Sequence, residues 1–384
     1  MPESRWQEDP QHAEKIEQLA AKVVDPIERL QFLRRATASA TRPEAGFRGK
    51  RAAAFLLLAA VVSLRSDANV HHQFELRAAP PSFHGATQVP DVWIVEENRD
   101  FETYSNGLRI ENRLAVANEP RSYSLIALEG GSTQGIPRAQ PAGIVFHATE
   151  SAQAPFVAGE RRKLQRIGKE LLLYVRGKRA YHFVIDRFGR VNRIVVESDA
   201  ANHAGNSVWA DSQWVYLDLN SSFLGVAFEA STESGDPSLN GALNEALNEA
   251  QIHAARVLTE MLRSKYNLAA ENCVTHAQVS VNPENMHIGW HSDWGKDFPF
   301  REVGLPDNYA EPLPSMWLFG FEYDAVYRAA TGPPLWKGLD AAEERSRQAA
   351  MEHGMTAGEY RALLRMRYRN RIAALRQRIA VEEN

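Results

Sequence analysis

The sequence predicts an α/β protein: a central mixed β-sheet flanked by helices, with helical extensions at the N- and C-terminal ends. Between residues 143 and 325, short β-prone runs alternate with amphipathic helical stretches, which is the pattern of a sheet covered by helices. Residues 1–45 repeat apolar side chains at three- and four-residue steps, and the last 45 residues are also predicted to be helical. These observations together define the expected fold class.

The N-terminal part divides into a polar helical segment at 1–45 and a short apolar segment at 48–68. Within the second, residues 52–64 carry no charge and follow a basic stretch. A membrane span needs about 20 apolar residues, so this run is closer in length to the apolar region of a signal peptide. The basic flank favours export of the C-terminal bulk. We expect an export signal or a short membrane anchor through 52–64; the competing interpretation is a buried helix of a soluble domain.

Residues 89–142 are predicted to be a strand-rich lead-in of unknown role. Strand signals occur at 92–95 and 123–128, separated by turn-rich stretches. The glycine-rich loop at 130–135 lacks the Lys-Ser/Thr ending of a phosphate-binding loop, so it predicts no nucleotide site.

Residues 143–325 are expected to form the main domain, and 326–384 a helical C-terminal extension. The arginines of that extension favour a solvated helix face over a contact with an anionic polymer or lipid. Two amphipathic helices are predicted in the main domain, at 161–176 and 241–265. Its predicted strands are 143–147, 181–187, 190–196, 223–229 and 272–276.

The amino-acid composition excludes several classes of binding site. The net charge of −4 over 384 residues gives no sign of the concentrated basic surface that nucleic-acid binding requires. The single cysteine excludes an intrachain disulfide framework and a multi-cysteine metal cluster. Any metal must therefore be held by histidine and carboxylate.

Two histidines stand at the ends of β-prone runs. His147 ends the run Ile144-Val145-Phe146, and His276 follows Cys273-Val274-Thr275. Open α/β sheets build their sites at the carboxyl ends of strands. Two imidazoles on such a sheet are two of the three protein ligands of a catalytic zinc site, and the third would be a histidine or a carboxylate.

Further motifs lie around these histidines. Tyr181–Val191 has the pattern of a strand, a tight turn and a returning strand, and 202–205 is a loop containing a histidine. The strand signal at 222–229 ends in Glu229. In Trp290-His291-Ser292-Asp293, the histidine and aspartate are two residues apart, so an extended segment would present both on one face.

In this order, the motifs resemble the zinc-dependent N-acetylmuramoyl-L-alanine amidases, a family that includes the peptidoglycan recognition proteins. The resemblance covers about 143–300, roughly 40% of the chain. It implies Zn²⁺ bound by His147, His276 and an aspartate. Asp293 aligns position for position with the family's third ligand, and Asp297 competes because it keeps a nearby lysine and proline at different spacing.

The resemblance also implies helpers for catalysis. Ala227 stands where bacterial members carry a glutamate, which leaves Tyr181 and Glu229 as substitutes, with Tyr181 weighed first. His291 stands where the family often has a catalytic lysine. Three residues are predicted to contact substrate: Thr149, Asn202 and His203, the last open between that role and an ordinary loop hydrogen bond.

The implied activity is zinc-dependent hydrolysis of the amide between N-acetylmuramic acid and L-alanine in peptidoglycan or muropeptides. The alternatives are a non-catalytic peptidoglycan-binding module of the same fold and a zinc amidase for another N-acyl substrate. The expected location is the bacterial cell envelope, in the periplasm or anchored to the membrane and facing outward.

Overall fold

The computed structural model describes residues 89–129, 137–232 and 247–382, all of which lie in one compact unit. The predicted segments 1–45 and 48–68, including the apolar run 52–64, lie outside the described residues. Across the three described ranges, no helix is long and apolar enough to cross a membrane.

The centre of the unit is an eight-stranded sheet in the order β1-β2-β3-β7-β6-β10-β5-β11. Four strands at one end, β6, β10, β5 and β11, run parallel, whereas β7 is antiparallel to β6, and β1 and β2 are antiparallel neighbours. The predicted mixed sheet is therefore confirmed. The strands are β1 (Ile94–Glu97), β2 (Phe101–Tyr104), β3 (Arg109–Glu111), β5 (Gly143–Ala148), β6 (Phe183–Ile185), β7 (Val191–Arg193), β10 (Phe223–Phe228) and β11 (Cys273–Thr275).

Two smaller sheets accompany it. One has the order β4-β9-β8 and the other pairs β12 with β13. Their strands are β4 (Ile126–Ala127), β8 (Val208–Ala210), β9 (Trp214–Leu217), β12 (Val281–Asn282) and β13 (His287–Ile288). The strands of the β6–β7 hairpin are shorter than predicted, because the Asp186 side chain accepts from the main-chain N–H groups of Phe188 and Arg190 and closes the turn early.

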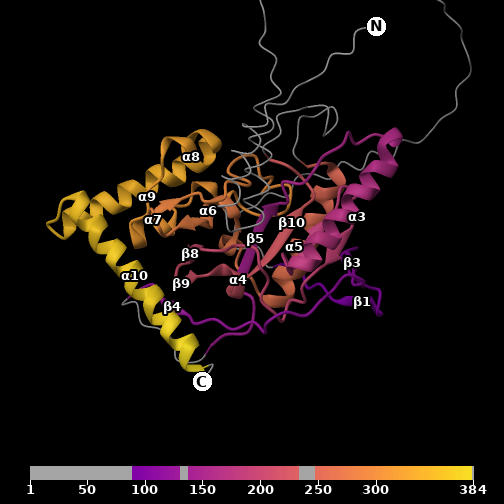
Figure 1. The fold of residues 1–384 in the computed structure, drawn as a ribbon, viewed down its shortest axis with the longest axis horizontal. Coiled ribbons are helices and arrows are strands. Elements are labelled where there is room, and N and C mark those ends of the chain that lie inside the picture. The colour runs from indigo at the N-terminus through magenta and orange to yellow at the C-terminus, as the bar shows by residue number, and fades with distance from the viewer. Residues whose placement is uncertain (1–88, 130–136, 233–246, 383–384) are drawn as a thin grey trace, which may run out of the picture. The chain divides into compact units, whose positions relative to one another are not determined.

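Helices cover both faces of the main sheet (Figure 1). On one face, Leu258, Met261 and Leu262 of α5 pack with alternate residues of β5 and β10, such as Phe146 and Val226. On the other face, Leu172 and Val175 of α3 pack with Val184 and Ala227. The helices are α3 (Arg161–Lys178), α4 (Leu219–Ser222), α5 (Glu249–Tyr266), α6 (His276–Val279), α7 (Pro314–Phe319), α8 (Ala325–Ala330), α9 (Pro333–Glu352) and α10 (Ala357–Glu382).

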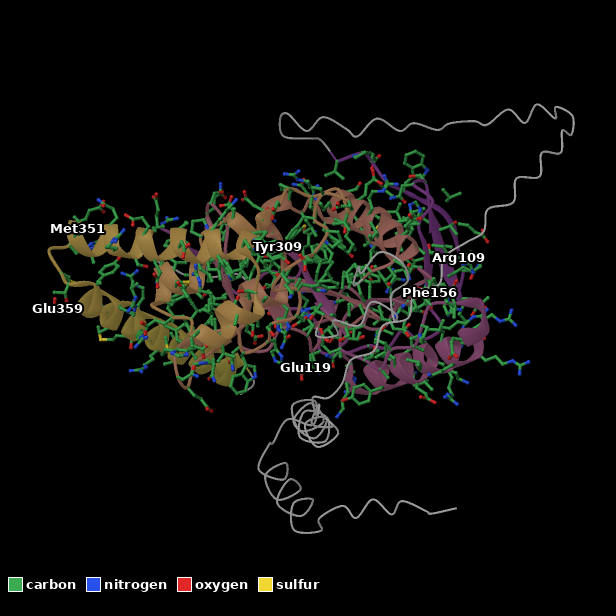
Figure 2. The ribbon with its side chains drawn as sticks, turned by 90° about the horizontal axis from the view of Figure 1, so that it is seen from above. Arg109, Glu119, Phe156, Tyr309, Met351 and Glu359 are labelled. Atoms are coloured by element: carbon green, nitrogen blue, oxygen red, sulfur yellow. The ribbon has the colours of Figure 1, made fainter. Side chains whose placement is uncertain are left out.

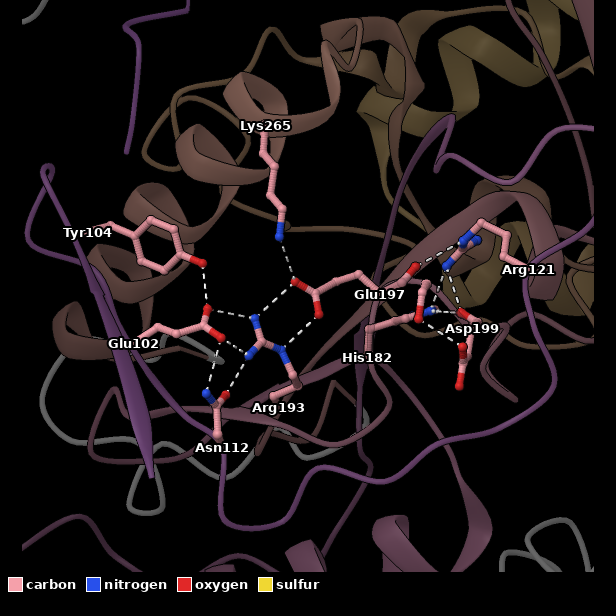
Figure 3. Close-up of polar contacts among 10 residues, drawn as sticks. Glu102, Tyr104, Asn112, Arg121, His182, Arg193, Glu197, Asp199 and Lys265 are labelled. Carbon is pink, nitrogen blue, oxygen red and sulfur yellow. Dashed lines mark hydrogen bonds and ion pairs between the residues drawn. The ribbon is translucent and has the colours of Figure 1, made fainter. Parts of the chain in front are cut away.

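The lead-in strands β1–β3 join the main sheet instead of forming a separate layer, because β3 pairs in parallel with β7. A buried polar cluster reinforces this junction (Figure 3). The Arg193 guanidinium donates to Glu102 at 2.6 and 3.0 Å, and it also forms ion pairs with Glu197. Lys265 of α5 adds a second cation 3.5 Å from Glu197.

The C-terminal helices α7, α9 and α10 pack against one another. Met351, near the end of α9, and Glu359, near the start of α10, lie far from the buried Tyr309 (Figure 2). Gly320 ends α7 with φ +68°, and a Cβ there would lie 2.7 Å from the Arg361 carbonyl oxygen, so the close approach of α10 requires glycine. Arg361 and Arg365 of α10 both pair with Glu322, which gives two of the C-terminal arginines a structural role.

Candidate metal centre

His147 is delivered by β5, whose six residues are all buried. The strand alternates, so Phe146 packs on the α5 face whereas the His147 side chain points toward the opposite face, in register with Ala227 of β10. The His147 side chain is 1% exposed.

His276 is delivered by the neighbouring strand β11, at the start of the short helix α6. The turn into α6 is fixed by a capping box in which Thr275 and Gln278 satisfy each other's main-chain N–H groups. This places the His276 ring beside the His147 ring, with centroids 4.5 Å apart.

Asp293 completes the group from the loop after β13. Its Oδ1 lies 2.8 Å from His276 Nδ1, and its Oδ2 lies 3.5 Å from His147 Nδ1. The Ala148 main-chain N–H donates to Oδ2 at 3.2 Å, which ties the carboxylate to the end of β5. The competing aspartate, Asp297, is exposed, whereas Asp293 is the carboxylate at the two histidines.

The electrostatics of the group favour the forms that bind a metal. Burial, and then the neighbouring His276, lower the pKa of His147 to about 4, so its ring is neutral. Burial opposes ionisation of Asp293, but the neighbouring His276, its hydrogen bond to the carboxylate and the close approach of His147 outweigh it and hold the pKa of Asp293 well below its ordinary value. A neutral imidazole beside a carboxylate is the pairing that a zinc ion requires.

The geometry also fits a metal ion. The ligand atoms of His147, His276 and Asp293 lie within 4.8 Å of one another. Ligand atoms in tetrahedral zinc coordination, with bonds of about 2.0–2.1 Å, lie roughly 3.3 Å apart. In addition, His276 Nε2 is a buried ring nitrogen without a hydrogen-bond partner among the described residues. Two imidazoles and one carboxylate match a catalytic zinc donor set.

Two of the predicted helpers border this group. The Tyr181 ring centroid lies 5.1 Å from that of His147, and Tyr181 has φ +63°, a left-handed conformation that turns the chain just before β6. Burial, and then the nearby carboxylate of Asp293, raise the pKa of Tyr181, so it remains a neutral phenol. The His291 ring stacks on His276 with centroids 4.7 Å apart.

Glu229, the third predicted helper, does not border the metal group. Its carboxylate accepts from the main-chain N–H of Arg187 at 3.1 Å and lies against Gly168 of α3. Burial raises its pKa to about 7. Strand alternation places Glu229 on the predicted face, but the structure engages it with the β6–β7 hairpin and α3 instead of the metal group.

The three residues predicted to contact substrate differ in accessibility. The Thr149 side chain is half-buried and hydrogen-bonds Ser151 at 2.9 Å. Asn202 is exposed, and its amide donates to the Lys178 carbonyl at the end of α3. His203 is buried at 8% exposure, and both of its ring nitrogens have protein partners: His147 Nε2 at 3.1 Å and the Phe223 carbonyl at 3.3 Å. Its position favours the hydrogen-bonding alternative over a substrate contact.

Sequence reasoning missed a second carboxylate near the group. Glu150 has φ +45° and accepts from the Thr232 main-chain N–H and from the hydroxyls of Ser231 and Thr232. Burial raises its pKa. It follows His147 by three residues, but its partners come from a loop 81 and 82 residues away, so no local signal could have found it.

Comparison with known proteins finds one family that the region around these residues resembles. Residues 137–296, which include His147, His276 and Asp293, match the family model of N-acetylmuramoyl-L-alanine amidase. This region is therefore similar to that family. The match covers less than half of the chain, and it confirms the resemblance carried by the ordered motifs. No match was found among curated proteins.

Similar solved structures include two from bacteria and one from an insect. The first is the N-acetylmuramyl-L-alanine amidase AmiD from E. coli, with 20% identity over 47% of this chain and 64% of that chain, and a TM-score of 0.31. The second is AmpDh3 from Pseudomonas aeruginosa, with 20% identity, 59% and 73% coverage, and a TM-score of 0.29. Drosophila peptidoglycan recognition protein SD has 16% identity, 43% and 84% coverage, and a TM-score of 0.25. At these values the likenesses add nothing to the family match.

Proposed function

We propose that the protein hydrolyses the amide bond between N-acetylmuramic acid and L-alanine in peptidoglycan or muropeptides, and that it requires zinc. The observation that carries the proposal is the convergence of His147, His276 and Asp293 within the region that matches the amidase family. Because that substrate is a component of the cell envelope, we propose the bacterial envelope as the site of action.

The metal ligands and the residues around them have separate roles in the proposed reaction. A zinc ion held by His147, His276 and Asp293 would polarise the scissile carbonyl and lower the pKa of a bound water to about 7. Tyr181, kept neutral by burial, can donate a hydrogen bond to the developing oxyanion. His291, stacked on His276, is the nearby imidazole suited to move a proton toward the leaving amine.

A binding module remains the second candidate, because Ala227 leaves no carboxylate at its position and Glu229 is engaged elsewhere. Such a protein would bind peptidoglycan without cutting it. The two functions differ in turnover.

The deciding experiment incubates the full chain with an anhydro-muropeptide and with peptidoglycan polymer and follows release of the L-alanyl peptide by mass spectrometry. We expect cleavage that EDTA abolishes and added zinc restores. Stable binding of the muropeptide with no released peptide would support the binding module and refute the enzyme.

Matched variants test the metal group. Asp293→Asn should abolish zinc binding and cleavage, whereas the exposed Asp297→Asn should leave both unchanged. The opposite pattern would show that the third ligand is misplaced.

A further inference from the structure

His203 is held in place from three directions. The main-chain N–H groups of His203 and Ala204 both donate to the Asn220 side-chain oxygen, at 2.9 and 2.7 Å. Beneath the ring lies Gly225 of β10, where a Cβ would come within 2.6 Å of the His203 Cγ. The ring edge meets the His147 ring at an interplanar angle of 81°. The position of the imidazole is therefore specified by main-chain and side-chain contacts.

The hydrogen-bond partners of His203 determine which of its ring nitrogens carries the hydrogen. Its Nε2 lies 3.3 Å from the Phe223 carbonyl oxygen, which can only accept, so Nε2 carries the hydrogen. A buried neutral imidazole has one N–H, which leaves Nδ1 as an acceptor. That Nδ1 faces His147 Nε2 at 3.1 Å, so His147 donates from Nε2.

The position of the hydrogen on His147 determines which of its ring nitrogens can bind a metal. With its hydrogen on Nε2, a neutral His147 carries a lone pair on Nδ1, and Nδ1 faces Asp293 Oδ2 at 3.5 Å. Two acceptors facing one another at that separation are suited to hold a cation between them. A ligand histidine commonly uses its second ring nitrogen to bond a carboxylate, carbonyl or water, which sets its tautomer; here a second histidine serves that purpose.

We infer that His203 is a positioning residue of the metal centre, which selects the His147 tautomer that leaves Nδ1 free for zinc. The inference rests on the proposed zinc-dependent function. It gives His203 a role in metal affinity in place of a contact with substrate.

The test compares zinc affinity among variants of the full chain by competition with a chromophoric chelator. His203→Leu removes the acceptor, and we expect zinc affinity to fall about 10- to 100-fold. His203→Asn places an oxygen near the position of Nδ1 and should retain most of the affinity. The Phe223 carbonyl keeps a partner in both, because Arg121 also donates to it. Asn202→Ala, in the same loop but without a contact to His147, is the matched control and should bind zinc normally.

Circular dichroism and metal-free thermal melting show whether each variant is folded. If His203→Leu does not fold, ¹⁵N NMR of the histidines in the zinc-loaded wild-type protein replaces it, and we expect the His147 proton on Nε2. Normal zinc affinity in a folded His203→Leu, or a His147 proton on Nδ1, would overturn the inference. Muropeptide cleavage is scored separately: zinc binding that depends on His203 without cleavage refutes the proposed function alone.

Discussion

The buried cluster between the lead-in strands and the main sheet predicts how stability depends on pH. Burial opposes ionisation of Glu102, but hydrogen bonds from Arg193 and Tyr104 and the charge of Arg193 outweigh it and lower the pKa of Glu102 to about 2. A carboxylate whose pKa is depressed on folding contributes stability above its unfolded pKa, here 4.5. That contribution is lost as the pH falls through the folded value.

The size of the effect follows from the shift. A difference of about 2.5 pKa units corresponds to roughly 3 kcal/mol at neutral pH, as an upper figure for a side chain that is 13% exposed. Less than half of that, about 1.4 kcal/mol, should remain at pH 3. Glu102→Gln should therefore cost up to about 3 kcal/mol at pH 7 and progressively less as the pH approaches 2.

Urea unfolding at pH 7, 5, 4 and 3 measures this difference between wild type and variant. Glu111→Gln is the matched control, since Glu111 pairs with Arg109 on an exposed surface and should cost no more than about 1 kcal/mol. A Glu102→Gln penalty that is constant from pH 7 to pH 3 would refute the reasoning, because the loss would then not involve the carboxylate charge.

Three further outcomes are expected. Gly225→Ala should displace the His203 ring, destabilise the fold by about 1–3 kcal/mol and weaken zinc binding measured by chelator competition; unchanged zinc affinity would contradict the contact. Tyr181→Phe should lower kcat on a muropeptide by about 100-fold or more with zinc content unchanged, and a loss of zinc instead would exclude an oxyanion role. Glu229→Gln should stabilise the protein above pH 7, by up to about 3 kcal/mol in urea unfolding, because burial raises the pKa of Glu229 to about 7 and ionising it costs folding free energy. Equal stabilisation at pH 4 would argue against that cause.

The sequence predicted the fold class and placed His147 and His276 at the ends of β-strands, because both features depend on local patterns. The runs that end at His147 and His276 are buried strands, and burial of a parallel sheet makes such runs nearly continuous in apolar residues. The helices at 161–178 and 249–266 likewise follow from their apolar spacing.

Other features depend on long-range contacts that a single sequence does not reveal. The spacing left Asp293 and Asp297 open, and the choice depends on a loop held by Tyr309, whose hydroxyl donates to the Trp294 carbonyl. The alternation of side chains along a strand predicted the sheet face on which Glu229 lies. It did not predict the hydrogen-bond partner of Glu229, which is the main-chain N–H of Arg187 on a neighbouring hairpin.

The parallel pairing of β3 with β7 has a practical consequence for where the chain can be shortened. A polypeptide that starts at residue 137, where the family match begins, would lack β1–β3 and leave β7 as an edge strand with unpaired main-chain groups. It would also lack Glu102, which is one of the two carboxylates that pair with the Arg193 guanidinium. The boundary of the family is thus not a boundary of the folding unit, and a soluble fragment should begin before Ile94.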